Sequence, residues 1–162
     1  MTAEQQLVDA TLRAWRFNMD RTTKFFDGLS DEQLQAEIAP GRNRLIYLLG
    51  HLAAVHDGML PLLGIGSRLH PELDATFLTT ADRSVATLPS AAELKAASAE
   101  IDRALSDAFN SWSATDWLAK HTAVSDEDFV REPHRNRFSV LLSRNSHMAF
   151  HYGQLVLAKP RT

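Results

Sequence analysis

Residues 45–66 read LIYLLGHLAAVHDGMLPLLGIG and form the longest apolar region of the 162-residue chain. Leucines recur in this region at steps of three and four, which predicts a helix with apolar side chains on more than one face. Two histidines, an aspartate and a proline interrupt it, and no unbroken apolar run approaches the roughly 20 residues that a membrane span needs. We therefore expect a helix buried inside a cytoplasmic protein, with no membrane as a partner.

This apolar region predicts the second of four long helices. We expect the helix to begin near Asn43, an N-cap that follows Pro40 and Gly41. It should end near Leu63, because Gly64 comes next and glycine is the usual residue after a helix.

The other three long helices are predicted by the same spacing and by capping residues. One begins after Ser90, where Glu93 completes a capping box, and the last runs from about Phe138 to Ala158. The first ends at Gly28 and has one face formed by Val8, Leu12, Trp15, Met19, Thr22, Phe26 and Leu29.

Two long connections, at about 64–88 and 113–137, separate these helices. In the second connection, SATDWLAK (113–120) predicts a short capped turn, and SDEDFVREPHRNR (125–137) predicts an acidic loop. Helices joined in this way are typical of a bundle. We predict an all-α four-helix bundle with long crossover connections, formed by residues 1–162 as a single domain.

Composition excludes several classes of function. The formal net charge of -3 provides no electrostatic basis for binding nucleic acid. The chain has no cysteine, which excludes disulfides and thiolate metal ligands. The first residues, MTAEQQLVDA, have neither a basic leader nor an apolar core, so we expect no signal peptide.

A pair of histidines in the last helix suggests a metal site. His147 and His151 lie four residues apart in HMAFHYGQ (147–154), so they point to the same side of the helix, one turn apart. Two neutral imidazoles so placed can share one divalent ion. The same spacing also suits histidines that only line a polar seam of the bundle.

The second helix offers two candidates for a third ligand, His51 and His56. They are five residues apart, hence about 140° around the helix, and cannot both point at the same spot. Each lies on an apolar stripe, so periodicity does not choose between them.

The combination of GRNRLIYLLGHLAAVHD (41–57) with HMAFHYGQL (147–155) resembles the DinB/YfiT-like superfamily of metalloenzymes. The resemblance covers essentially the whole chain, including helix order and the crossover connection. It implies that His51, His147 and His151 are the metal ligands and that His56 is a packing or outer-shell residue.

Three histidine ligands leave coordination positions open, as in a catalytic rather than a closed structural site. Zinc suits such ligands, and nickel is also accepted by imidazole. The resemblance implies a small-molecule substrate and a thiol-dependent S-transferase that uses a mycothiol- or bacillithiol-type thiol. A metal-dependent hydrolase and a non-catalytic, stress-associated metal-binding protein are the alternatives. Because the chain has no cysteine, any sulfur nucleophile must come from a cosubstrate.

Residues near the histidines are candidates for supporting roles. Tyr47 could point its hydroxyl into the site or only pack, and Arg144 could hold an anionic substrate or extend to the surface. Gln154 could orient a histidine or tie the last helix to the first. Asp57 could pair with the neighbouring His56 or with a basic side chain. Trp15 and Asn18 on the first helix could line the cavity.

The apolar faces of the second helix also predict self-association as a homodimer.

Overall fold

The computed structural model describes residues 2–158, which form helices joined by turns and loops, with no strand among them. The all-α fold is therefore confirmed. In chain order the elements are α1 (Ala3–Asp27), the 3-10 turn η1 (Gln33–Gln35), α2 (Leu45–Asp57), α3 (Met59–Leu63), α4 (Leu73–Phe77), α5 (Ala91–Ser111), α6 (Ala114–Leu118), α7 (Asp126–Arg131) and α8 (Arg137–Ala158).

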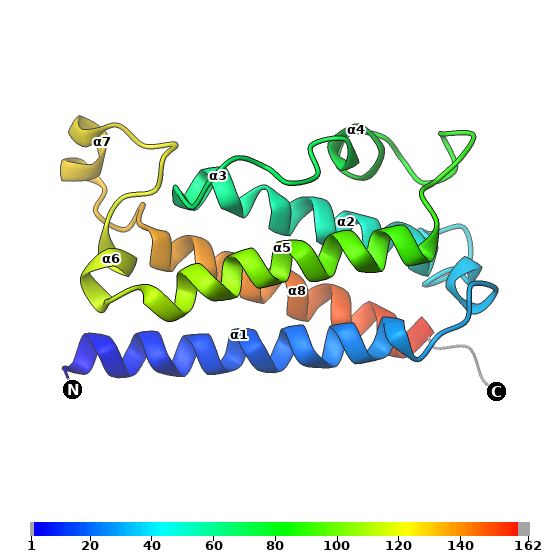
Figure 1. The fold of residues 1–162 in the computed structure, drawn as a ribbon, viewed down its shortest axis with the longest axis horizontal. Helices are drawn as coiled ribbons and strands as arrows, with labels where there is room; N and C mark the ends of the chain where they lie inside the picture. Colours follow the sequence, from blue (N-terminus) through cyan, green and yellow to red (C-terminus); the bar gives the residue numbers. More distant parts are fainter. Residues whose placement is uncertain (1, 159–162) are drawn as a thin grey trace.

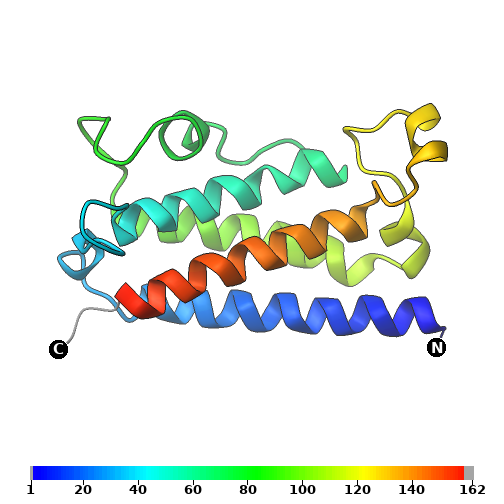
Figure 2. The same ribbon diagram turned by 180° about the vertical axis from the view of Figure 1, so that it is seen from behind.

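The long helices α1, α2, α5 and α8 lie side by side (Figures 1 and 2). Helix α2 contacts α5 and α8, and α1 contacts α8. The connection that contains α4 runs over the outer side of α2, while α6 and α7 lie together at one end of the long helices.

Several predicted helix ends are confirmed by hydrogen bonds. Ser90 and Glu93 form a full capping box at the start of α5, and Ser113 does the same with Asp116 at the start of α6. Gly64 follows α3 with φ of 74°, a left-handed conformation that a residue without a Cβ adopts at no steric cost.

The second predicted helix is divided in two at Gly58. Pro61 has no N–H to donate to the carbonyl group of Asp57, so the hydrogen-bond ladder of α2 cannot continue through it. Pro61 instead occupies the first turn of α3, where an N–H would have no helical partner.

Two details of the predicted boundaries are wrong. The residue before α2 is Arg44, not Asn43, and its side chain makes no capping bond. The segment predicted as an acidic loop contains α7, because the Ser125 hydroxyl accepts a hydrogen bond from the Asp128 N–H and starts a turn of helix there.

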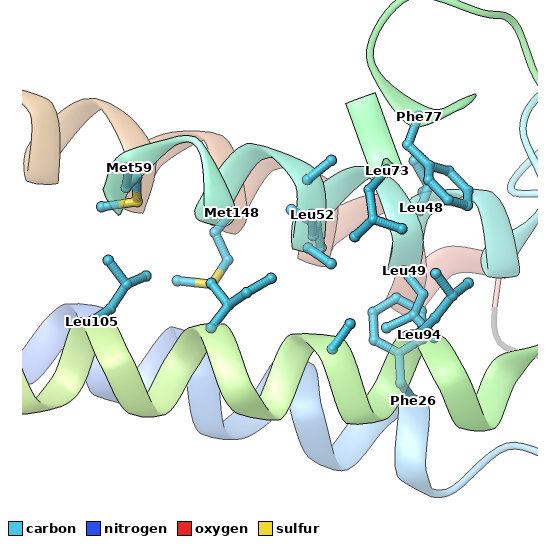
Figure 3. Close-up of a cluster of buried hydrophobic side chains, with 14 of the residues drawn as sticks. Phe26, Leu48, Leu49, Leu52, Met59, Leu73, Phe77, Leu94, Leu105 and Met148 are labelled. Atoms are coloured by element: carbon cyan, nitrogen blue, oxygen red, sulfur yellow. The ribbon is translucent and has the colours of Figure 1, made fainter. Parts of the chain in front are cut away.

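Helix α2 forms the centre of the core. All its residues are buried except His51 and Val55, which are half-buried and lie four apart on one face. Leu49 and Leu52 of α2 pack in the same cluster as Phe26 of α1 and Leu94 of α5 (Figure 3).

Residues Leu45–Leu63 are long and apolar enough to cross a membrane by composition alone, and 72% of that window is buried inside the protein. Packing against the neighbouring helices accounts for the apolar character of this segment.

Polar contacts fasten the connection between α3 and α5 onto α2. Asp57, fully buried, accepts hydrogen bonds from the N–H groups of Leu69 and His70. Arg44 pairs with Asp82 at 2.7 Å. Burial acts to raise the pKa of Asp82, but hydrogen bonds from the Arg44 side chain and N–H outweigh it and lower that pKa.

The apolar faces of α2 are covered within the chain, and the homodimer stays a prediction. Many of the large exposed apolar side chains lie on α1 and α8, namely Leu7, Phe17, Leu142, Phe150, Val156 and Leu157, and others, such as Val130, lie elsewhere.

Gly50 on α2 allows the connection to lie close to the helix, because a Cβ at this position would overlap the Phe77 ring. We expect Gly50→Ala to lower the free energy of unfolding by about 1–3 kcal/mol, the usual cost of overpacking. Urea denaturation followed by circular dichroism measures this loss.

Gly153→Ala is the matched control, since Gly153 is also helical but has open space where its Cβ would be. It should leave stability unchanged or raise it by about 0.5–1 kcal/mol. Equal effects of the two substitutions would contradict the close packing of Phe77 on Gly50.

Candidate metal centre

Helices α2 and α8 bring three histidines together. The Nε2 atom of His147 lies 3.3 Å from Nε2 of His51 and 3.1 Å from Nε2 of His151. The three potential ligand atoms all lie within 4.8 Å of one another, and each side chain is half-buried. The pair in α8 meets one histidine of α2, as the resemblance implied.

The backbone holds His51 in a fixed orientation. Its Nδ1 lies 2.9 Å from the carbonyl oxygen of Phe77 in α4. A carbonyl oxygen can only accept, so Nδ1 carries the proton in the neutral ring and Nε2 presents a lone pair.

Gln154 fixes the orientation of the His151 ring in the same way. Its Oε1 atom accepts a hydrogen bond of 2.8 Å from Nδ1 of His151. This contact leaves Nε2 of His151 as a second lone pair that faces the centre.

His147 lies between the other two and is kept uncharged. Burial, followed by the nearby His151, His51 and Arg144, lowers its pKa from 6.5 to about 4. Burial also lowers the pKa of His151. Neutral imidazole is the form that binds a metal, so both rings are ready to ligate at pH 7.

The ring nitrogens of the three histidines are better arranged to bind a cation than to hydrogen-bond to one another. Two lone pairs point at Nε2 of His147, whose single proton can satisfy only one of them. The other ring nitrogen of His147, Nδ1, is buried and has no hydrogen-bond partner in the described part of the chain. A cation held by the three Nε2 atoms would remove the conflict between the lone pairs.

His56 lies outside this cluster. Its ring packs on Trp15 with centroids 5.1 Å apart, and its Nδ1 lies 3.8 Å from Oδ1 of Asp102 on α5. Asp57 does not pair with His56 but lies 3.9 Å from Arg68. Of the two candidates on α2, His51 is therefore the one that joins the pair on α8.

Tyr47 packs beside the site rather than entering it. Its ring stacks on His51 with an angle of 8° between the planes, while its hydroxyl donates to the carbonyl oxygen of Thr80 at 2.7 Å. The hydroxyl is thereby used to hold the connection after α4.

Arg144 lies on α8 one turn before His147. Its Nε is buried and has no hydrogen-bond partner within residues 2–158, and the side chain lines a groove of about 220 Å³ between α8 and Leu62. Trp15 packs on His56, and the Asn18 side chain donates to Asn145 of α8.

The contact of the Phe77 carbonyl group with His51 was not predicted from the sequence. Every residue except proline carries the same backbone donor and acceptor, so a carbonyl that orients a ligand has no signature in the sequence. Only the path of the connection over α2 places it at His51.

The model of the DinB superfamily matches residues 14–155. The chain belongs to the DinB superfamily. This match covers all three histidines and the four long helices, except for residues 3–13 of α1 and 156–158 of α8. A comparison with curated proteins gives no match.

In this member of the DinB superfamily, Gln154→Leu should weaken metal binding about 10–100-fold, because His151 loses the acceptor that fixes its proton on Nδ1. Competition with a chromogenic zinc chelator measures the affinity. Gln154→Glu keeps an acceptor oxygen at this position and serves as the control. Equal affinity of wild type and Gln154→Leu would show that the contact does not orient the ring.

The metal-free DinB protein should become less stable as the pH falls from 6.5 towards about 4, because His147 has its pKa lowered to about 4 in the folded state. Over this range the unfolded chain binds the proton and the folded chain does not, so acid favours unfolding. His147→Gln should flatten this part of the profile of stability against pH, while His134→Gln, on an exposed side chain, should not. Parallel profiles for wild type and His147→Gln would contradict the lowered pKa.

Proposed function

We propose that this protein is a divalent-metal-dependent enzyme, most suited to zinc or nickel, that transfers a group to or from a small thiol cosubstrate. The observation that carries the proposal is the convergence of three Nε2 atoms, two of which are made acceptors by bonds on the far side of their rings. Imidazole nitrogen is a ligand that both metals accept.

The number of ligands favours an open site over a structural one. Three side chains leave at least one coordination position for a substrate, whereas structural zinc sites use four. His51 also lies on the one face of α2 that is only half-buried, and this is the side from which we expect a small molecule to approach the cluster.

The chemistry that such an ion supplies is Lewis acidity, which lowers the pKa of a thiol or water that reaches it. The side chains and backbone of the protein provide the ligands and keep them in place. His51, His147 and His151 hold the ion and keep one geometry because Phe77 and Gln154 fix two of the rings.

Two grooves reach α8 on either side of the histidines, which suits a reaction between two substrates. Arg144 lines one groove, of about 220 Å³, and Gln154 lines the other, of about 520 Å³, together with Arg42 and Leu157. The guanidinium of Arg144 suits an anionic group on one of the substrates. If sulfur is the nucleophile, a thiol must be one of the two substrates, because the chain contains no cysteine to supply it.

Metal content tests the site itself. Protein made without a histidine tag should hold one zinc or nickel ion per chain, and His51→Ala should lose it because only two ligands remain. His56→Ala should keep the ion, since His56 lies against Trp15 and Asp102. Elemental analysis of dialysed samples gives the ratio, and metal lost with His56→Ala alone would overturn the proposed ligand set.

Activity separates transfer from hydrolysis. With metal bound, the protein should accelerate conjugation of mycothiol or bacillithiol to monochlorobimane, and His147→Ala should reduce the rate to background. Hydrolysis of 4-nitrophenyl acetate without any thiol, in the absence of conjugation, would favour the hydrolase instead. A stoichiometric metal with neither activity would favour a non-catalytic metal-binding protein.

A further inference from the structure

A second polar site lies on the other side of α2, in a pocket between α1, α2 and α5. The pocket has a volume of about 110 Å³. Apolar side chains form most of its wall, and the polar side chains of Thr22, His56 and Asp102 reach it from three different helices.

Each of these polar side chains has a buried atom without a hydrogen-bond partner among residues 2–158. The atoms are Oγ1 of Thr22, Nε2 of His56 and Oδ1 of Asp102. Thr22 and His56 are only 7% and 3% exposed, so bulk water does not compensate them. Buried polar groups are nearly always paired, and leaving one unpaired destabilises the protein.

Thr22 differs from Thr11 of the same helix in this respect. The hydroxyl of Thr11 donates to the carbonyl oxygen of Leu7, four residues earlier on the same helix, as helical threonines often do. Thr22 has the same opportunity on α1 and does not take it. Its hydroxyl is therefore free to bind something that enters the pocket.

The three atoms define a donor and an acceptor. Oδ1 of Asp102 lies 3.8 Å from Nδ1 of His56. Of the two neutral tautomers of the ring, this contact favours the one with its proton on Nδ1, which leaves Nε2 as an acceptor. The Thr22 hydroxyl can donate. One hydroxyl group on a ligand would satisfy both, because it donates to Nε2 of His56 and accepts from Thr22.

The apolar side chains of the pocket wall indicate that the rest of the ligand should be apolar. Met19, Phe26, Leu49, Leu52 and Met148 surround the space with apolar surface. An engineered apolar cavity of about 150 Å³ takes up benzene, so a pocket of about 110 Å³ suits a ligand no larger than a single six-membered ring.

The charges at the pocket disfavour an anion. Asp27 and Asp102 line it with Lys95, so the carboxylates outnumber the ammonium group. A neutral ligand fits this arrangement better than a carboxylate, which would lie beside two like charges.

We propose that the pocket between α1, α2 and α5 is a second binding site, for a small phenol or aromatic alcohol held by His56 and Thr22. It is separate from the three-histidine centre. His56 and His51 lie about 140° apart around α2, and Met148 forms part of the pocket wall while its neighbour His147 joins the cluster.

Binding of phenol tests the site, with toluene as a probe of the same shape that lacks the hydroxyl. Calorimetric titration of the intact protein should give one phenol per chain, bound at least about tenfold more tightly than toluene, because toluene leaves two buried polar atoms unpaired. No saturable binding of phenol would overturn the proposal.

Three substitutions test whether phenol binds in this pocket. Thr22→Val should weaken phenol about tenfold and leave toluene unchanged, whereas Thr11→Val, on the same helix but away from the pocket, should alter neither. Ser98→Leu, which adds volume to the wall, should weaken both probes. If Ser98→Leu does not fold, Thr22→Val alone decides the question, since unchanged affinity for phenol would place the site elsewhere.

A further variant excludes the metal centre as the source of the signal. His51→Ala removes one of the three clustered histidines and should leave binding of phenol unchanged. Loss of phenol binding in His51→Ala together with retention in Thr22→Val would mean that phenol binds at the metal centre, and the proposed second site would be wrong.

Discussion

The burial of α2 on nearly every side is the constraint from which the rest of the structure follows. Eleven of its 13 residues are buried, and the half-buried remainder is His51 with Val55 on one face. Covering so much apolar surface requires α5, α8 and the connection with α4 to pack around it. The half-buried face of α2 is where its imidazole group meets the two imidazole groups of α8.

The same constraint explains why the sequence predicted the helices better than it predicted the rotation of α2. Capping boxes at Ser90 and Ser113 are local hydrogen-bond patterns and can be recognised from residue types alone. A helix that is apolar all round has no polar face to mark its outside, so His51 and His56 were equivalent by periodicity. The resemblance to a family, not the spacing, singled out His51.

Three other features were not predicted, and only one of them depends on contacts between distant segments. The division of the second helix at Gly58 has a local cause in Pro61, which lies three residues later in the apolar run. The position of the Phe77 carbonyl could not be inferred, since it depends on how closely the connection approaches Gly50. Helix α7 was missed because its acidic residues suggested a solvated loop, although Ser125 before them is an ordinary N-cap.

Helix α2 carries His51 and His56 on different sides, and the two imidazole rings have different surroundings. His51 has its far nitrogen satisfied by backbone and its near nitrogen directed at other imidazoles. His56 has a carboxylate on one side and an unpaired nitrogen on the other, next to an apolar space. In an interior this apolar, each unpaired nitrogen is costly, and a cation or a hydroxyl group is the kind of partner that removes the cost.

The contact between His51 and the Phe77 carbonyl has a consequence for how this protein tolerates change. The hydrogen bond uses the main chain, so replacing the side chain at position 77 leaves the acceptor in place as long as the path of the connection is kept. An insertion or deletion between Asp57 and Phe77 would instead shift the carbonyl along α2 and free the proton on His51 to move to the other nitrogen. The centre is thus protected against substitution in the connection but sensitive to its length.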